Sequence, residues 1–416
     1  VHELEGIVES GAPKVVVYSE DWRPQLEELK QGFTTVEYIV AISSPGADER
    51  DFAERDAMDA VLVDPPELVM DDPWGIYYTG GTTGLPKGAV LTHRNVTWNS
   101  VNTIASWGIH GGHRSALQLP FFHIGGPNIF MVPLVHVGGT TILCTGFDPD
   151  ETFDLVEKSG ITHYVGVPTM YQMLQEHPRW RDADFSKLEL VISGGAPCPL
   201  PIMEKFWSRG VDFKMGYGLT EASGNNFWLP PDRVREKVGS VGFPNFHIDM
   251  KVIRGDGTVC EDGEEGELLI RGPNVFAGYW RNPEATAETI RDGWLHTGDI
   301  AVRDTEGCFS ILGRSKDMFI SGGENVYPAE IESVLLAHPQ VLDAAVVGVP
   351  HDTWGEVGRA FLVVEDSYDE DDLRAFLEER LARYKLPRSI VLLDVLPLTA
   401  IGKVDKKRLE AGEISE

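Results

Sequence analysis

The chain has 416 residues, more than one hydrophobic core accommodates, so about two or three domains are expected. Asp and Glu outnumber Lys and Arg by 65 to 36, and the resulting net charge of −29 argues against binding to nucleic acid, which needs a basic surface. No apolar run approaches the roughly 18 residues of a membrane-spanning helix. No signal peptide is recognised.

The four cysteines stand singly, without a Cys-x-x-Cys motif. This argues against a disulfide framework and against a zinc site, and it makes a cytoplasmic location the expectation. The acidic surplus is spread along the chain rather than gathered in a tail. It fits either an ordinary soluble acidic protein or one adapted to a high-salt cytoplasm, where salt screens dense charge.

The first seventy residues alternate expected helices and strands. Residues 4–9 and 22–30 have helical patterns, and residues 14–18 and 36–41 are strand-like. An alternation of this kind is typical of βαβ units, so a parallel sheet is predicted here.

A stretch rich in Gly and Thr follows, Tyr77-Tyr-Thr-Gly-Gly-Thr-Thr-Gly-Leu-Pro-Lys-Gly88. Glycines let backbone N–H groups approach an anion closely, hydroxyl groups add donors, and Lys87 adds a positive charge, so the stretch is predicted to bind phosphate. It is not a Walker A motif, because Pro86 stands where that motif needs Gly. The alternative interpretation is a turn between a strand at 74–78 and a helix from about Arg94.

This stretch resembles the signature loop of the adenylate-forming superfamily, which includes acyl-CoA synthetases, firefly luciferase and the adenylation domains of peptide synthetases. The resemblance implies that the loop binds the phosphates of ATP. In full-length relatives a further segment usually precedes this point, so the chain is expected to be a truncated form or a fragment. The implied phosphate-binding residues are Thr79, Gly80, Gly81, Thr82, Thr83, Gly84 and Lys87.

A second matching stretch is Leu119-Pro-Phe-Phe-His-Ile-Gly-Gly126. A His beside two aromatic residues is often simply packed in a core. In acyl-CoA synthetases and plant coumarate ligases, a Phe-His pair at this place borders the acyl and adenylate pockets, which implies a catalytic or pocket role for His123. Domains that activate amino acids usually carry an Asp here. The match therefore disfavours an amino acid substrate.

Two further stretches are expected to surround the nucleotide. Leu190-Val-Ile-Ser-Gly-Gly-Ala-Pro197 is predicted to be a buried strand that ends in a Gly-rich turn, which could also be a plain connection to a helix. In the superfamily this turn, here Gly195 and Ala196, lines the adenine. Met215-Gly-Tyr-Gly-Leu-Thr-Glu221 is the other stretch, and relatives often have Gln or Asn where Met215 stands.

In the second of these stretches, the ring of Tyr217 can stack on adenine and the backbone of Gly216 can bond to it. Thr220 can donate a hydrogen bond to the α-phosphate. Glu221 is a hard oxygen ligand suited to Mg²⁺, with Thr79 as its expected partner.

Residues 239–280 have the turns and alternation of a small β-rich subdomain that serves mainly as scaffold. In Gly293-Trp-Leu-His-Thr-Gly-Asp299, the carboxylate of Asp299 can accept both vicinal hydroxyl groups of a ribose; the alternative is an Asp in a turn. In the run from Gly313 to Glu332, the resemblance implies a ribose contact for Arg314 and an interdomain hinge at Lys316. Gly322 and Gly323 are implied to lie against the pantetheine arm of CoA.

The remaining residues are expected to form an α+β lid. Residues 331–337 and 371–383 have helical patterns, and residues 344–348 and 359–364 are strand-like. In Leu398-Thr-Ala-Ile-Gly-Lys-Val-Asp-Lys407, an isolated lysine would ordinarily be solvated. By its match to the last motif of the superfamily, Lys403 is implied to reach into the active site.

The expected fold is α/β, with a large N-terminal domain of parallel sheets (residues 1–315) that contains the β-rich subdomain and a smaller mobile C-terminal lid (residues 316–416). The resemblance implies an ATP-, Mg²⁺- and CoA-dependent synthetase that converts an apolar carboxylic acid, predicted to be a fatty acid, into acyl-AMP and then acyl-CoA. The alternatives are an aryl- or o-succinylbenzoate-CoA ligase and a non-catalytic protein that binds nucleotide or acyl-adenylate. A homodimer is one assembly that the sequence allows.

Overall fold

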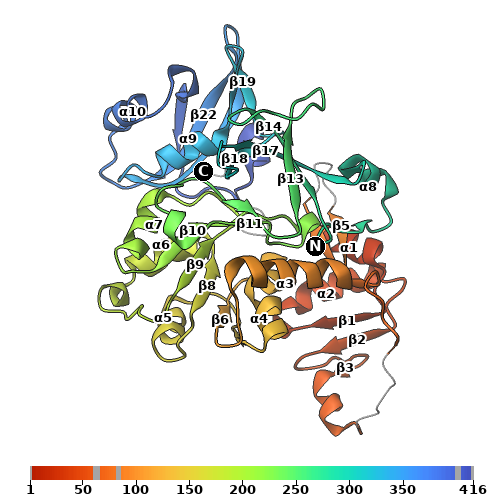
Figure 1. Ribbon diagram of the computed structural model, residues 1–416. Coiled ribbons are helices and arrows are strands. Elements are labelled where there is room, and N and C mark those ends of the chain that lie inside the picture. The colour runs from red at the N-terminus through yellow and green to blue at the C-terminus, as the bar shows by residue number, and fades with distance from the viewer. Residues whose placement is uncertain (1, 60–65, 81–85, 399–403, 414–416) are drawn as a thin grey trace.

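The computed structural model describes residues 2–59, 66–80, 86–398 and 404–413. Parallel sheets form the N-terminal part, an antiparallel sheet follows, and a separate mixed sheet with its own helices forms the C-terminal part (Figure 1). This arrangement confirms the predicted α/β fold class. Among the described residues, no helix combines the length and the apolar character needed to cross a membrane.

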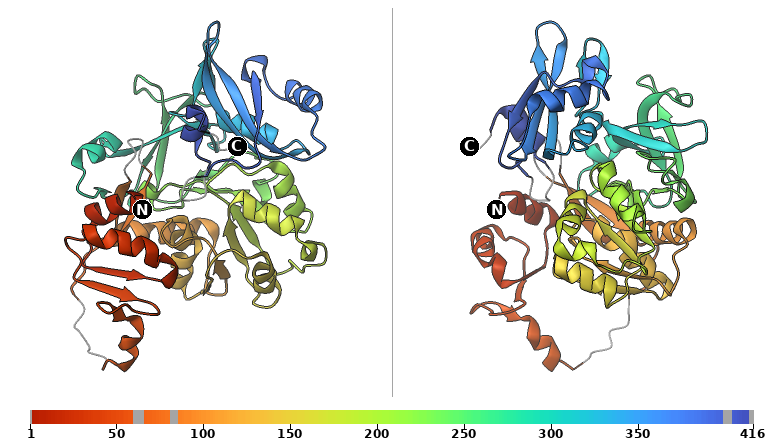
Figure 2. Two further views of the ribbon diagram at one scale, coloured as in Figure 1. Left: turned by 180° about the vertical axis from the view of Figure 1, so that it is seen from behind. Right: turned by 90° about the vertical axis from the view of Figure 1, so that its left-hand side faces the viewer.

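The first seventy residues form a small parallel sheet, as the βαβ pattern predicted. Strands β1 (Val15–Tyr18), β2 (Tyr38–Ala41) and β3 (Arg50–Asp51) lie side by side in that order. Helices α1 (His2–Gly11) and α2 (Arg23–Leu29) precede β1 and connect β1 to β2. Figure 2 shows that this unit projects to one side of the larger central sheet.

A five-stranded parallel sheet forms the centre of the N-terminal part, with the strand order β10-β9-β8-β6-β7. Its strands are short and largely buried, which is typical of a parallel sheet that helices cover on both faces. The strands are β6 (Arg114–Leu117), β7 (Thr140–Leu143), β8 (His163–Gly166), β9 (Leu190–Ser193) and β10 (Asp212–Met215).

Successive side chains on these strands point to opposite faces, and each face has its own hydrophobic core. Val191 and Phe213 pack in the core that contains α5, α6 and α7, whereas Leu190 and Ile192 pack in the core that contains α3 and α4. The helices are α3 (His93–Trp107), α4 (Val132–Val137), α5 (Pro149–Glu157), α6 (Pro168–Glu176) and α7 (Leu200–Trp207).

The predicted phosphate-binding stretch lies in a β-hairpin. Strands β4 (Pro73–Thr79) and β5 (Lys87–Thr92) are antiparallel, with Thr79 opposite Lys87, and β15 (Gly278–Tyr279) pairs with β5. The strand and the helix that the alternative interpretation expected on either side of a turn are both present, but β5 was missed, because it intervenes before α3 begins at His93. Loop residues Gly81, Thr82, Thr83 and Gly84 lie outside the described residues.

The β-rich region extends further along the chain than the expected residues 239–280. A short pair, β11 (Phe227–Trp228) and β12 (Phe243–Pro244), precedes a sheet in the order β13-β14-β17-β16, and β18 pairs with β17. Helix α8 (Pro283–Thr289) precedes β16. The strands of the sheet are β13 (Asp249–Ile253), β14 (Glu265–Arg271), β16 (Ile290–Arg291), β17 (Trp294–Arg303) and β18 (Phe309–Arg314).

The C-terminal sheet has the order β20-β19-β22-β21, with β23 parallel to β22. Helices α9 (Pro328–Leu335) and α10 (Glu370–Glu378) pack on one face, and α11 (Lys406–Ala411) packs on the other. The strands are β19 (Phe319–Ser321), β20 (Glu324–Val326), β21 (Val341–His351), β22 (Gly355–Val364) and β23 (Ser389–Leu392). The domain division expected between residues 315 and 316 stays a prediction.

Helix α10 ends five residues earlier than the sequence pattern predicted. The backbone N–H of Arg380 donates to the carbonyl oxygen of Leu377, which is the tighter spacing of a 3₁₀ turn. A second 3₁₀ turn follows at Arg383–Lys385. The N–H of Leu381 still donates to the carbonyl oxygen of Leu377 with α-helical spacing, and beyond it the apolar periodicity continues without a regular helix.

Gly218 lies where the chain passes very close to itself. A Cβ atom at this position would overlap the carbonyl oxygen of Gly224, which is a backbone atom and cannot rotate away. We expect Gly218→Ala to lower the free energy of unfolding by about 2 kcal/mol or more, because the whole turn must shift. Gly146→Ala is the matched control, since no atom lies within 4 Å of its added Cβ. Equal thermal melting curves for the two variants would contradict this account.

Candidate functional site

The loops at the carboxyl ends of the central strands bring together several residues singled out from the sequence. His123 follows β6, Gly195 and Ala196 follow β9, and Gly216 follows β10. The N–H of Gly216 donates to the carbonyl oxygen of Ser193 over 2.8 Å, so the turns after β9 and β10 are joined directly. In open parallel sheets, ligands bind at this edge.

The turn after β9 needs glycine for a specific reason. Gly195 has a φ of +81°, in the left-handed region that glycine tolerates best. Gly216 faces Ile192, whose methyl group would lie 2.9 Å from an added Cβ. Both turns therefore expose backbone rather than side chains, which suits a surface that a flat ligand approaches.

Asp299 is the most buried charged residue of the candidate site, with 4% of its surface exposed. The hydroxyl of Tyr217 donates to its Oδ2 over 2.5 Å, and Nε of Arg314 lies 2.8 Å from its Oδ1. Asp299 and Arg314 are directly opposite each other on β17 and β18. Asp299 thus lies in a strand, so the alternative of an Asp in a turn is wrong.

Burial and the neighbouring charges shift the protonation of this cluster. Burial, and then the Asp299 carboxylate, raise the pKa of Tyr217 well above its usual value. Burial alone would lower the pKa of Arg314, but Asp299 and other acidic neighbours raise it overall. The cluster therefore presents a neutral phenol and a guanidinium cation beside a shielded carboxylate.

A second cluster lies at the base of the loop between β4 and β5. The hydroxyl of Tyr279 donates to Oε1 of Glu221 over 2.7 Å, and Nζ of Lys87 lies 5.4 Å from the centre of the Tyr279 ring. The hydroxyl of Thr79 lies 3.4 Å from the carbonyl oxygen of Lys87. Lys87 and Glu221, distant in the sequence, are therefore both in contact with Tyr279.

Sequence reasoning missed Tyr279. The stretch Gly278-Tyr-Trp280 was assigned to the scaffold, yet β15 places its tyrosine between the predicted phosphate-binding lysine and the predicted metal ligand. Burial, and then Glu221, raise the pKa of the Tyr279 hydroxyl, so it stays a hydrogen-bond donor. Pairing of β15 with β5 is a long-range contact that no local pattern indicated.

Thr220 and His123 lie close to these clusters. Thr220 begins a short 3₁₀ turn, Thr220–Ala222, which carries Glu221. Nδ1 of His123 accepts a hydrogen bond from the N–H of Gly125 over 3.1 Å. The adjacent Ile124 belongs to the same hydrophobic cluster as Ala222, and Tyr217 packs against that cluster.

Three of the predicted functional residues lie apart from these clusters. Lys316 is exposed in the segment that connects β18 to β19. Gly322 and Gly323 form the turn between β19 and β20, at the end of the C-terminal sheet that points away from the N-terminal part (Figures 1 and 2). Lys403 lies outside the described residues.

The chemistry of these side chains suits a nucleotide with a bound cation. Asp299 and Arg314 can bind hydroxyl groups, and Lys87 can pair with phosphate. Oxygen atoms of Glu221 and Thr79 are hard donors of the kind that Mg²⁺ prefers, and Mg²⁺ usually takes few protein ligands beside phosphate oxygens. The residues present therefore fit Mg²⁺.

Comparisons with known proteins agree with this chemistry. The family model of the AMP-binding enzymes matches residues 1–280, and that of the AMP-binding enzyme C-terminal domain matches residues 330–403. Feruloyl-CoA synthase from Amycolatopsis sp is 45% identical over 353 residues, which are 84% of this chain and 72% of that protein. Indoleacetate–CoA ligase from Aromatoleum aromaticum is 41% identical, over 84% of this chain and 68% of that protein.

A solved structure extends the comparison to the whole fold. The o-succinylbenzoate-CoA synthetase of Bacillus subtilis, in complex with its acyl-adenylate intermediate, has a TM-score of 0.86 and 32% identity. The match covers 98% of this chain and 80% of that one. The chain therefore belongs to the AMP-binding enzyme family, as an acid–thiol ligase of the adenylate-forming acyl-CoA synthetase type.

Proposed function

We propose that this enzyme joins CoA to an apolar carboxylic acid that carries an aromatic ring. The observation that supports the ring is the set of relatives, which are synthetases of feruloyl-CoA, indoleacetyl-CoA and o-succinylbenzoyl-CoA. The first two are more than 40% identical to this chain. The fatty acid predicted from the sequence is the second candidate, because the pair Phe121-Phe122 suits any apolar acid.

The loop after β6 supports an apolar substrate. Phe121 and Phe122 are 52% and 63% exposed, which is unusual for large apolar side chains beside a candidate site. His123 follows them, and no carboxylate stands in this loop to bind an amino group. A ring or an alkyl chain could cover the two phenyl groups on binding and remove their apolar surface from water.

In the first half of the proposed reaction, an oxygen of the carboxylate bonds to the α-phosphorus of ATP. The bond from that phosphorus to the bridging oxygen breaks, and pyrophosphate leaves with the electron pair. Lys87 and the loop before it would neutralise the phosphates, and Thr220 would donate to the α-phosphate. Glu221 and Thr79 would hold Mg²⁺, which supplies positive charge beside the phosphate oxygens when bound.

The remaining groups would position the nucleotide. Asp299 and Arg314 would bind the ribose hydroxyl groups, and the turns at Gly195 and Gly216 would border the adenine. Tyr217 has a second role that the sequence did not indicate, because its hydroxyl already holds Asp299 in place. Lys403 would approach the α-phosphate during this half of the reaction only.

In the second half, the sulfur of CoA bonds to the acyl carbon, AMP leaves with the electron pair of the broken C–O bond, and the thiol loses its proton. Gly322 and Gly323 would border the pantetheine arm. Because their turn lies at the end of the C-terminal sheet that points away from the N-terminal part (Figure 1), residues 316–416 would have to rotate about Lys316 between the two halves. A homodimer and a cytoplasmic location stay predictions.

The acid can be identified by a substrate panel. We expect pyrophosphate release and CoA consumption with feruloyl-type and arylacetic acids, weaker turnover with fatty acids, and none with amino acids. Release should be measured with and without CoA, because a non-catalytic nucleotide-binding protein would give neither product. Turnover of amino acids alone would contradict the proposed substrate class.

The ribose contact can be tested at Asp299. We expect Asp299→Asn to weaken ATP binding about 10-fold or more, since hydrogen bonds to a charged group contribute about 1.5–3 kcal/mol each. The amide keeps the size of the side chain and can still accept from Tyr217. Titration calorimetry without the acid measures binding alone.

Asp262→Asn is the matched control for this substitution. Asp262 pairs with Arg303 over 2.7 Å at the other end of β17, and both side chains are partly exposed. Loss of this ion pair should leave the dissociation constant for ATP unchanged. Equal affinities in both variants and the wild type would exclude Asp299 from the nucleotide site.

The two halves of the reaction can be separated with two lid variants. Lys403→Ala should slow acyl-AMP formation by several orders of magnitude, yet convert pre-made acyl-AMP and CoA to the thioester at a nearly normal rate. Gly323→Leu should form acyl-AMP normally and fail with CoA, because a bulky side chain would obstruct the pantetheine arm. If each variant lost both halves together, the residues would only support the folding of the lid.

A further inference from the structure

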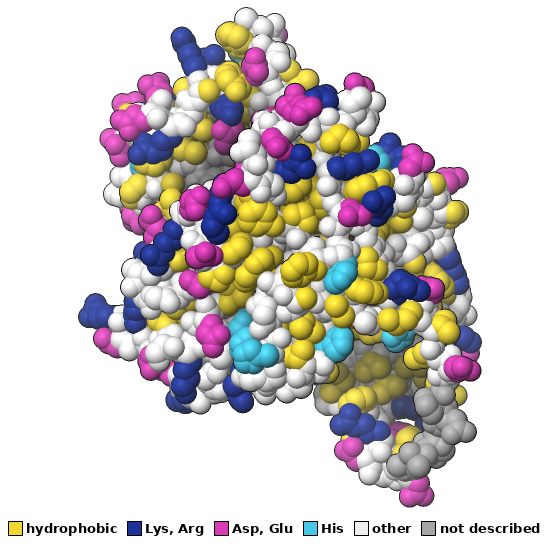
Figure 3. Space-filling model, in the orientation of Figure 1, with side chains coloured by type: hydrophobic (Ala, Val, Ile, Leu, Met, Phe, Trp, Pro, Cys, Tyr) yellow, Lys and Arg dark blue, Asp and Glu magenta, His cyan; other side chains and the backbone are white. Residues whose placement is uncertain are grey.

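A cluster of histidines lies at the edge of the central sheet opposite to the candidate nucleotide site. His113 immediately precedes β6, His163 is the first residue of β8, and Glu189 immediately precedes β9. These strands are neighbours and parallel, so their amino ends meet at one edge. Figure 3, which has the orientation of Figure 1, shows histidine side chains on the surface near the place where Figure 1 labels β6.

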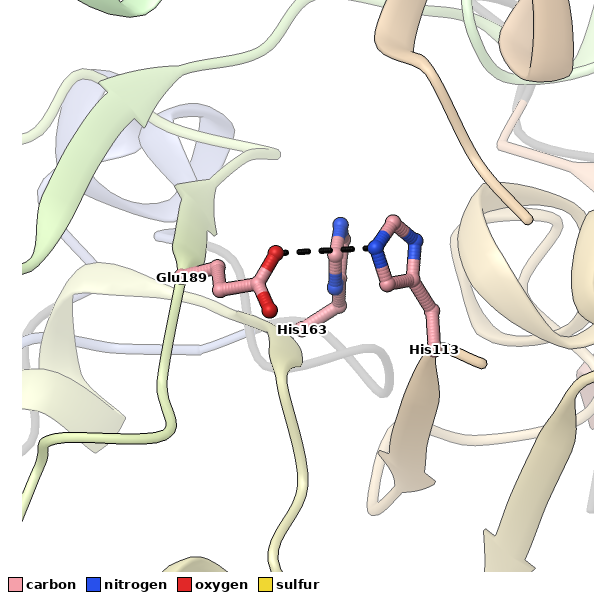
Figure 4. Close-up of side chains that lie close together, drawn as sticks. All are labelled: His113, His163 and Glu189. Carbon is pink, nitrogen blue, oxygen red and sulfur yellow. Dashed lines mark ion pairs between the residues drawn. The ribbon is translucent and has the colours of Figure 1, made fainter. Parts of the chain in front are cut away.

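Figure 4 shows that the three side chains lie close together. One potential ligand atom from each residue lies within 4.8 Å of the other two, and Nε2 of His113 is 3.5 Å from Oε2 of Glu189. A tetrahedral ion with bonds of about 2.0–2.1 Å would hold two ligand atoms about 3.4 Å apart. The separation observed for this pair is close to that value, and the other pairs of ligand atoms lie within 4.8 Å.

The surroundings orient the imidazoles. Oγ1 of Thr162 lies 2.8 Å from Nδ1 of His163, which leaves Nε2 of that ring for a ligand. Metal-bound histidines usually have such a second hydrogen bond, because it fixes the ring. The ring of His110 stacks on His113 with 3.6 Å between the centroids and borders the same cavity, which has a volume of about 310 Å³.

The two imidazoles are largely removed from solvent. His113 and His163 are 7% and 3% exposed. Lys214 is the nearby basic residue. Its side-chain nitrogen lies 3.5 Å from the ring centre of Trp228 and 4.5 Å from that of Trp107, so it contacts these two rings.

We propose that His113, His163 and Glu189 form a binding site for a divalent transition-metal ion of the zinc type. Two imidazoles and one carboxylate are a ligand set that zinc uses, with the fourth position left for water. The ion would join the amino ends of β6, β8 and β9. Since nucleotide would bind at the carboxyl ends, this ion takes no part in the ligase reaction.

Binding requires local changes. The rings of His113 and His163 pack against each other with 4.2 Å between their centroids, so one ring must turn before a nitrogen of each can face the same ion. The N–H of His110 donates to Nδ1 of His113, but over 3.4 Å, which is a long hydrogen bond. A cation at Nε2 needs the imidazole proton on Nδ1, so this contact would be given up. Cysteine spacing gave no sign of this site, because its ligands are not cysteines and share no local sequence motif.

The test is Zn²⁺ binding to the full chain without ATP, measured by competition with a chromophoric chelator. We expect one tight site per chain in the wild type. Glu189→Gln and His163→Gln should each weaken binding at least 10-fold. Glu189→Gln is the primary variant because its side chain is 59% exposed, so the substitution should leave the fold and the ligase activity intact.

His177→Gln is the matched control. Its Nε2 lies 3.7 Å from Asp150, so it is also a histidine beside a carboxylate, but it is not part of a group of three ligands among the described residues. We expect the His177→Gln variant to bind Zn²⁺ with the same affinity as the wild type. Absence of tight binding to the wild type, or unchanged binding to Glu189→Gln with native melting behaviour, would overturn the proposal.

Discussion

The buried carboxylate of Asp299 constrains how the two N-terminal sheets fit together. A charge that leaves water costs several kcal/mol unless other groups satisfy it. Asp299 obtains its partners from both sheets: Tyr217 follows the parallel strand β10, and Arg314 ends the antiparallel strand β18. The two sheets must therefore keep a relative position in which both partners reach the carboxylate. The same position brings the Gly-rich turns next to the ribose-binding candidates.

A similar arrangement links the loop hairpin to the rest of the site. Tyr279 pairs through its backbone with β5 and through its hydroxyl with Glu221. Tyr217 and Tyr279 thus each donate a hydrogen bond to a carboxylate for which the sequence predicted a binding role. Asp299 was predicted to bind ribose, and Glu221 was predicted to bind Mg²⁺. Because burial keeps both phenols protonated, they remain donors over the pH range in which the carboxylates are charged.

Much of the fold followed from local pattern. The strands at β1, β2, β9 and β22 and the helices at α1, α2 and α9 lie within a few residues of the expected ranges, since each has a clear periodicity or a flanking turn. The family signatures singled out Asp299, Arg314, Lys87 and Glu221, which lie in two clusters in the structure, and their roles stay predictions. Strand β5 was missed because its residues, Lys87–Thr92, continue a loop motif without a boundary signal.

Long-range pairs explain what the sequence could not provide. Tyr217 and Asp299 are 82 positions apart, and Glu221 and Tyr279 are 58 apart. The histidine cluster is a similar case, because its members come from three strand ends between residues 113 and 189. Only the strand order β9-β8-β6 makes them neighbours, and strand order is a global property of the sheet.

The connection between β18 and β19 has a mechanical consequence. Arg314 is the last residue of β18, and β19 begins at Phe319, so four residues separate the ribose-binding candidate from the C-terminal sheet. In a rotation about this segment, each atom moves in proportion to its distance from the pivot. Arg314 would hardly move, whereas the turn at Gly322 and Gly323, at the far end of the sheet, would travel along a wide arc. The segment would act as the pivot of a lever whose short arm carries Arg314 and whose long arm carries the turn at Gly322 and Gly323.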